Sequence, residues 1–174
     1  MEYFHDLSGR SDLDPIPDVP FDVDDCRAHM VPELMVLDMA KSRHFWRELL
    51  EWEVVFSREA HDYLRMGEAE IMICQATRHW STAPFEPPLG RGINFKIFVD
   101  DPVPLRDRLV AAGWPIFEDL TEEWPVQDGV AWGYRQFLVQ DPDGYLVRFA
   151  AKLGARPAGE ETEPPADGVY EADQ

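Results

Sequence analysis

The alternation of apolar and polar positions predicts two copies of one short arrangement of elements. Residues 32–56 read PELMVLDMAKSRHFWRELLEWEVVF, and residues 94–117 read NFKIFVDDPVPLRDRLVAAGWPIF. Each segment begins with an apolar run typical of a strand, passes an acidic residue into a helix-like stretch, and ends in a second strand. Asp38 and Asp101 mark the acidic break in each copy and lie 63 residues apart. We therefore predict an internal repeat.

In the first copy, the local signals support a strand followed by a helix. Glu33–Leu37 is a short apolar run, and Asp38 can cap the N-terminus of the helix that follows. Phe45 and Leu49 lie four residues apart, as expected for one buried face of that helix.

In the second copy, residues 93–99 alternate as a half-buried strand does. This alternation places Asn94, Lys96 and Phe98 on one face and the apolar residues on the other. Gly113 is suited to end the helix that follows.

Each copy then continues with a pair of strands. We predict strands at residues 63–66 and 71–74 in the first copy, and at 135–140 and 145–149 in the second. The last two are joined by Asp-Pro-Asp-Gly at residues 141–144, in which proline fixes φ and glycine accepts a positive φ. The order in each copy is therefore β-α-β-β-β, and the fold class is α+β.

Composition excludes several classes of protein. The 174 residues are 45% hydrophobic, which is enough for a core, and include 34 acidic against 16 basic residues, a net charge of −18. This charge disfavours recognition of nucleic-acid backbones. There is no apolar run long enough for a membrane span and no secretory signal, and two cysteines do not suggest a disulfide scaffold. We expect a soluble cytoplasmic protein.

The repeat and the distribution of acids divide the chain into three parts. Residues 1–30 are expected to form an acidic N-terminal arm. Residues 31–151 are expected to form one domain, with modules at about 31–76 and 93–151. Residues 152–174 are rich in Pro, Glu, Ala and Gly, and this composition predicts a disordered acidic tail.

Two βαβββ modules ending in RQFLVQDPDGYLVRF, residues 135–149, resemble the vicinal oxygen chelate superfamily. Within it, the chain is most similar to bleomycin resistance proteins and their glyoxalase-like relatives, over roughly residues 31–151. The resemblance implies two modules whose sheets form a shared concave cleft, and it implies a homodimer.

Enzymes of this superfamily hold a divalent metal on side chains that face the cleft. Carried over to this chain, the ligand positions are Val31, Asn94 and Arg148, with a fourth near Met72 or Cys74. Valine has no donor atom, arginine repels a cation, and asparagine alone is a poor ligand. We therefore predict no metal and no cofactor.

Other residues do not restore a metal site in the sequence. The five histidines show no spacing typical of metal ligands, and Cys74 has no base beside it, which favours an inert buried thiol. Glu33 lies one pleat along from Val31, and we expect it to pair with Arg148 across the cleft.

The segment Asp119–Phe137 is predicted to be a loop with aromatic residues in a polar setting. Such aromatics either stack on flat ligands and cations or pack locally. Together with the cleft positions, the predicted ligand-binding residues are Trp124, Trp132, Tyr134, Glu33, Asn94, Arg148 and Phe98.

Three functions remain open. The first is a metal-free protein that binds a small molecule, such as a cationic, partly planar antibiotic of the bleomycin type, without altering it. The second is a metal-dependent lyase, isomerase or dioxygenase of the same superfamily. The third is a module whose acidic head and tail recruit a protein partner. We favour the first, which is not catalytic.

Overall fold

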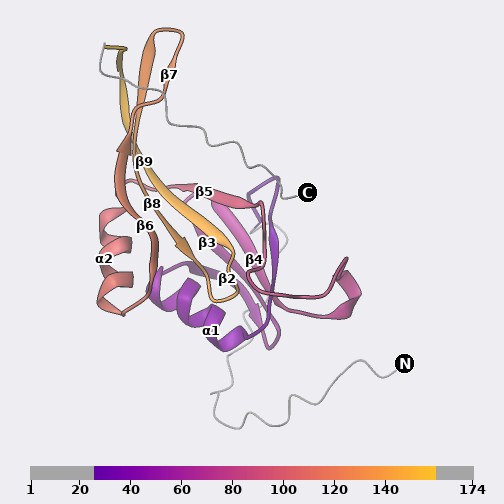
Figure 1. Cartoon of the computed structure of the whole chain (residues 1–174). Helices are drawn as coiled ribbons and strands as arrows, with labels where there is room; N and C mark the ends of the chain where they lie inside the picture. Colours follow the sequence, from indigo (N-terminus) through magenta and orange to yellow (C-terminus); the bar gives the residue numbers. More distant parts are fainter. Residues whose placement is uncertain (1–25, 160–174) are drawn as a thin grey trace. The chain divides into compact units, whose positions relative to one another are not determined.

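The chain forms two compact units, divided between Pro84 and Phe85. The structure is a computed structural model and describes residues 26–159 (Figure 1). Most of the predicted N-terminal arm and the last fifteen residues of the predicted tail lie outside the described residues. In both units a helix is followed by antiparallel strands.

Between residues 26 and 84, unit 1 contains four strands and one main helical segment. Its elements are β1 (Glu33–Val36), α1 (Met39–Arg43), the π-helix η2 (His44–Leu49), β2 (Glu53–Arg58), β3 (His61–Met66), β4 (Ala69–Gln75) and the short η3 (Arg78–Trp80). The sheet order is β1-β4-β3-β2. Strand β1 runs parallel to β4, and the other pairs are antiparallel.

Unit 2 repeats this connectivity. Its elements are β5 (Asn94–Phe98), α2 (Val103–Ala111), β6 (Ile116–Glu123), β7 (Val126–Gln127), β8 (Val130–Gln140) and β9 (Leu146–Pro157). The order is β5-β9-β8-β6, with β5 parallel to β9 and with β7 paired to β8. The predicted α+β fold of two βαβββ modules is confirmed, whereas the cleft between the modules stays a prediction.

The predicted helix boundaries have clear chemical causes. The Asp38 carboxylate accepts hydrogen bonds from the backbone N–H groups of Ala40 and Lys41, at 3.1 and 3.3 Å, and so caps α1. Gly113, with φ of +72°, follows α2. Among the residues that the structure describes, no helix is long and apolar enough to cross a bilayer.

The Asp-Pro-Asp-Gly segment forms the tight turn that its composition predicts. Asp141 Oδ1 accepts hydrogen bonds from the backbone N–H groups of Asp143 and Tyr145, at 3.0 and 2.9 Å. Gly144 has φ of +93°, and a Cβ atom there would lie 2.4 Å from the Cβ of Pro88. Glycine is therefore required both by the backbone conformation and by the close approach of residue 88.

The prediction of a loop at residues 119–137 is wrong. Strands β6, β7 and β8 occupy most of this segment, and Asp128 and Gly129 join β7 to β8 with φ of 53° and 76°. Two successive residues with positive φ make the two-residue turn that suits the twist of a hairpin. Trp132 and Tyr134 therefore belong to strand β8.

The predicted boundary between domain and tail is too early. Strand β9 continues to Pro157 and pairs there with Val130 of β8, so residues 152–157 of the predicted disordered tail form part of a sheet. Figure 1 shows β7 beside the far ends of the long strands β8 and β9. Backbone pairing with β8 gives this polar segment an order that its composition does not suggest.

Aromatic side chains dominate the core of unit 1. Phe45 and Trp46 of η2 are fully buried, and their rings meet edge to face with centroids 5.1 Å apart. Trp52 is packed edge to face against Trp46 at 5.3 Å. Leu34 and Ile73, which face each other across β1 and β4, are also buried.

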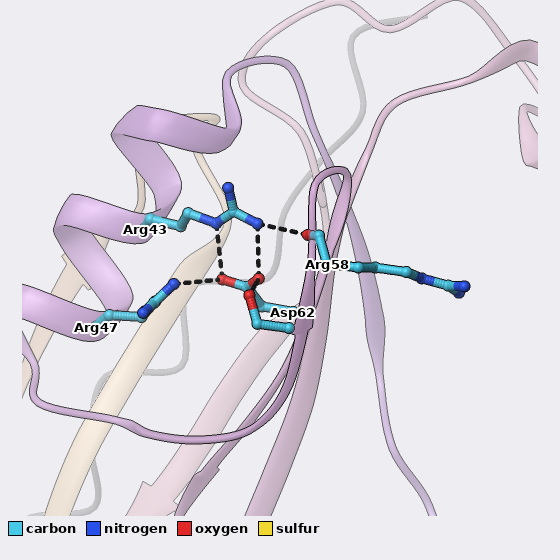
Figure 2. A network of polar contacts seen from close by, with 5 residues as sticks. Arg43, Arg47, Arg58 and Asp62 are labelled. Carbon is cyan, nitrogen blue, oxygen red and sulfur yellow. Dashed lines mark hydrogen bonds and ion pairs between the residues drawn. The ribbon is translucent and has the colours of Figure 1, made fainter. Parts of the chain in front are cut away.

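A buried carboxylate joins the helix of unit 1 to its sheet (Figure 2). Asp62 on β3 is fully buried and accepts hydrogen bonds from Arg43 Nε and Nη2 at 3.0 and 2.8 Å, and from Ser57 Oγ at 2.8 Å. Arg47 adds a longer contact at 3.4 Å. Arg43 Nη2 also donates to the carbonyl oxygen of Arg58 at 2.7 Å, so one guanidinium links the helix to both β2 and β3.

Replacing Asp62 by Asn should destabilise the protein by about 3 kcal/mol, because Arg43 would be left as a buried cation without its counter-charge. The measurement is the free energy of unfolding from urea denaturation. The control is Glu48→Gln, which removes the exposed pair with His44 and should change stability by less than about 0.5 kcal/mol. Equal effects of the two substitutions would contradict the importance of the buried network.

Glu70 on β4 binds the segment that precedes β1 through hydrogen bonds. Its carboxylate accepts hydrogen bonds from the backbone N–H groups of Arg27 and Ala28, from Tyr63 Oη at 2.7 Å and from Arg65 Nε at 2.7 Å. Burial would raise the pKa of Glu70, but these donors outweigh it and lower the pKa to about 2. The ionised form is therefore part of the folded structure.

The Glu70 contribution to stability should depend on pH. Because its folded pKa is lowered from 4.5 to about 2, the stabilisation is complete above about pH 4.5 and is lost as the pH falls towards 2. Glu70→Gln should lower the free energy of unfolding by about 1–3 kcal/mol at pH 7. The difference from the unmodified chain should shrink between pH 4.5 and 2. Parallel stability curves over that range would contradict this assignment.

Candidate functional site

The sheet of unit 2 has a buried face and a second face rich in polar groups. Ile97, Phe137 and Phe149 are buried and lie in register on β5, β8 and β9. Asn94 and Lys96 are exposed on the opposite face of β5. The alternation predicted for residues 93–99 is thus confirmed for Asn94–Phe98, whereas Ile93 lies outside the strand and is 51% exposed.

Four of the seven predicted ligand-binding residues share this second face, namely Asn94, Phe98, Tyr134 and Arg148. Strand pairing sets Lys96 opposite Arg148, and Phe98 opposite Ala150. We call the part of this surface formed by Lys96, Phe98, Tyr134, Gln136, Arg148 and Lys152 the cationic face.

Two lysines surround an aromatic pair on the cationic face. The rings of Phe98 and Tyr134 have centroids 6.1 Å apart. Lys96 Nζ lies 4.1 Å from the Tyr134 centroid, and Lys152 Nζ lies 4.8 Å from that of Phe98. Phe98 nevertheless keeps 50% of its surface exposed. The face therefore offers an apolar surface bordered by positive charge.

Two polar atoms of the cationic face are buried without a hydrogen-bond partner among the described residues. They are Arg148 Nε and Gln136 Oε1, and the Gln136 side chain is almost completely buried. Buried polar atoms normally have partners, and functional sites are among the places where they do not. An N–H donor and an amide acceptor on adjacent strands are therefore left unpaired beneath the exposed surface of this face.

The charge of Arg148 acts on its neighbour Lys96. Burial and the positive charge of Arg148 lower the pKa of Lys96, and Glu123 opposes this shift. A like charge nearby disfavours the protonated form of a lysine. The cationic face thus concentrates positive charge on a chain whose net charge is −18.

Trp124 and Trp132 lie on the extension formed by β7 and the ends of β8 and β9. The Trp124 ring covers Gly133, where an added Cβ would lie 2.5 Å from it, and Arg156 stacks on the ring at 3.8 Å. These contacts fit the local packing that was the alternative for Trp124. Trp132, opposite Ala155, is 48% exposed. A ligand role for either tryptophan stays a prediction.

Glu33 belongs to unit 1, so its expected pairing with Arg148 of unit 2 stays a prediction. Within unit 1, Glu33 lies close to His61 and Cys74: one ligand atom of each residue lies within 4.8 Å of the others. His61 is directly opposite Cys74 across β3 and β4, and Glu33 is on the neighbouring strand β1. We call these three residues the Glu33–His61–Cys74 cluster.

The surroundings of this cluster change the protonation of two members. Burial and the charge of Arg58 lower the pKa of His61, while Glu33 and Asp62 oppose that shift. Burial raises the pKa of the Cys74 thiol, as do the charge of Glu33 and a hydrogen bond to its carboxylate. Without a metal, the cluster therefore favours a neutral imidazole and a protonated thiol.

Sequence reasoning missed the cluster. Cys74 was predicted to be an inert thiol, although the fourth superfamily position was placed near Met72 or Cys74, and no spacing pointed to His61. The three residues lie 28 and 13 positions apart and form no local motif. Only the pairing of β1, β3 and β4 brings them onto one face. The alternation of side chains along each strand, combined with the strand register of the βαβββ repeat, could have placed these three residues on one face.

Each unit is a βαβββ module whose sheet has one polar face. Two such modules in one chain define the class of protein. The profile of the Glyoxalase/Bleomycin resistance protein/Dioxygenase superfamily matches residues 27–149, and the chain belongs to this superfamily. No match is found among the curated proteins.

Solved structures share the fold at low sequence identity. A protein from the mobile metagenome of V. Pseudocholerae has 19% identity and a TM-score of 0.53, with 72% of this chain and 95% of that chain covered. TioX from Micromonospora sp. ML1 has 23% identity and a TM-score of 0.51, with coverages of 71% and 95%. A glyoxalase-related enzyme from Fulvimarina pelagi has 20% identity and a TM-score of 0.53, with coverages of 71% and 87%.

The metal positions implied by the superfamily do not fit a metal here. Strand register makes Met72 the counterpart of Arg148, because Met72 lies opposite Glu33 as Arg148 lies opposite Lys96. The set is then Val31, Met72, Asn94 and Arg148. It offers no carboxylate or imidazole and includes a cation, which is a poor donor set for a divalent metal. We derive no chemistry through these four positions.

Substitution of Arg148 by Gln should raise the pKa of Lys96, because it removes the neighbouring positive charge. The measurement is NMR titration of the lysine side-chain carbons. Arg135→Gln is the matched control, since Arg135 is paired with Glu122 at 2.7 Å and should leave Lys96 unaffected. An unchanged Lys96 titration in Arg148→Gln would show that the two cations do not interact.

Proposed function

We propose that this protein binds a small molecule without altering it, and that the ligand group meeting unit 2 is flat and anionic. The observation that carries this proposal is the partly buried Arg148, whose Nε has no hydrogen-bond partner among the described residues and which lies opposite Lys96. A guanidinium in that setting is suited to bind a carboxylate or a similar anion. The proposal needs affinity and no catalytic group.

The aromatic pair supports a flat ligand. The half-exposed Phe98 and its neighbour Tyr134 offer apolar area next to the two lysines. A ligand that combines a ring with an anionic substituent can bury the ring against Phe98 while its charge reaches Arg148.

The sign that we propose for the ligand differs from the sequence-based expectation. A cationic antibiotic of the bleomycin type suits the net charge of −18. Such a ligand would meet Lys96, Arg148 and Lys152 on the cationic face, and like charges at a contact cost binding energy. The anionic class is therefore the main proposal, and bleomycin itself is included in its test.

A charge-matched pair of probes tests the proposal. Naphthalene-2-carboxylate and 2-naphthylmethylammonium have the same ring system and opposite charges. Isothermal titration of the full chain should give saturable binding of the carboxylate and much weaker binding of the ammonium compound. Metal-free bleomycin is titrated under the same conditions. Preference for the ammonium compound or for bleomycin would overturn the anionic assignment.

Variants test whether the carboxylate probe binds on the cationic face. Arg148→Gln should weaken binding of the carboxylate probe by about 10- to 150-fold, because a charged hydrogen bond contributes about 1.5–3 kcal/mol. Arg135→Gln, whose guanidinium is already paired with Glu122, should bind as the unmodified chain does. Equal affinities of all three proteins would show that the probe binds elsewhere.

The superfamily resemblance implies a homodimer, and we include that assembly in the proposal. Sedimentation equilibrium of the full chain tests it, with a mass of twice 20.1 kDa expected.

A further inference from the structure

We propose that Glu33, His61 and Cys74 form a binding site for a divalent zinc ion within unit 1. The proposal goes beyond the function above, which concerns the cationic face of unit 2. It also uses none of the four superfamily metal positions once strand register assigns the fourth to Met72 and not to Cys74. The whole donor set comes from three adjacent strands of one sheet.

The donor set suits zinc. A thiolate, an imidazole and a carboxylate are the three ligand types that zinc uses most, and the mixture of soft and hard donors disfavours magnesium and calcium. Three protein ligands leave a fourth tetrahedral position for water or for a donor atom of a bound molecule. The cluster is accessible as well, because Glu33 is exposed and His61 and Cys74 are partly exposed.

The geometry needs only a small adjustment. The three ligand atoms already lie within 4.8 Å of one another. Tetrahedral zinc with bonds of about 2.0–2.3 Å needs ligand atoms about 3.3–3.8 Å apart. Rotations of the Glu33 and His61 side chains can supply the difference, while the paired strands hold Cys74 in place between β1 and β3.

The charges around the cluster are consistent with a bound dication. Glu33 and the Cys74 thiolate contribute two negative charges once the thiol proton has passed to solvent. Arg58 lies opposite His61 on β2, and its charge acts on both His61 and Cys74. On the far side of the sheet, Asp62 is already neutralised by Arg43. One zinc ion would thus replace the Cys74 proton and balance the charges of Glu33 and the thiolate, while Arg58 leaves one positive charge beside the site.

Cobalt(II) serves as the spectroscopic probe for the reduced full chain. We expect one bound Co²⁺ per chain, a thiolate-to-cobalt charge-transfer absorption in the near ultraviolet, and loss of that absorption when one equivalent of Zn²⁺ is added. Cys74→Ser should abolish the absorption. His61→Gln and Glu33→Gln should retain it but weaken the affinity at least about tenfold.

Two control variants separate the cluster from the other thiol and from a surface histidine. Cys26→Ser and His44→Gln should bind cobalt as the unmodified chain does, since His44 is an exposed partner of Glu48. Thermal unfolding without metal verifies that each variant is folded. A folded chain that binds no cobalt, or an absorption that is lost in Cys26→Ser and kept in Cys74→Ser, would overturn the proposal.

Discussion

Unit 1 depends on the neutralisation of one buried carboxylate. Asp62 is fully buried on the helix-facing side of β3, where an unpaired charge would cost several kilocalories per mole. Arg43 meets this requirement from the helix and, through the Arg58 carbonyl, also holds β2 (Figure 2). Because successive side chains of a strand alternate, fixing Asp62 on this side directs its neighbour His61 to the other. The ion pair between Arg43 and Asp62 therefore fixes the face of β3 on which His61 lies, and the Glu33–His61–Cys74 cluster depends on that face.

The same connectivity produces different chemistry in the two units. In each unit the first strand pairs in parallel with the last, β1 with β4 and β5 with β9. Side chains of residues that are opposite each other in these pairs therefore lie on the same face of the sheet. In unit 1 such positions carry Glu33 and Cys74. In unit 2 the counterparts of Glu33 and Cys74 are Lys96 and Ala150, and Arg148 replaces Met72. A repeated backbone thus supports one face suited to a cation and another suited to an anion. The superfamily fold by itself identifies neither ligand.

Much of the fold could be predicted because its signals are local. The Asp38 cap and the Gly144 turn each depend on neighbouring residues and on the conformational preferences of one residue type. The strands at residues 119–137 were missed although Asp128-Gly129 is a strong hairpin signal, because the acidic and aromatic residues around it suggested a loop. The order of residues 152–157 could not be predicted, since it comes from pairing with β8 and not from composition.

The site residues divide in the same way. Asn94 and Phe98 could be placed on one face from alternation alone, but their relation to Arg148 and Tyr134 depends on register across β5, β8 and β9. The proximity of His61 and Cys74 also depends on strand register, and no sequence motif indicates it. Register is set by interactions distant in sequence, such as the Asp62 network, so local patterns leave it undetermined.

The net charge of the chain and the local charge of the cationic face favour ligands of opposite sign, and charge acts mainly at short range. Acids on exposed loops are screened by salt over about 10 Å, whereas partly buried groups are screened much less. The interaction of Lys96 with Arg148 therefore matters more at the cationic face than the chain total of −18. Two cations kept side by side oppose folding by their repulsion. An anionic ligand would relieve that repulsion when it binds, and so part of the unfavourable energy stored in the free protein would become affinity.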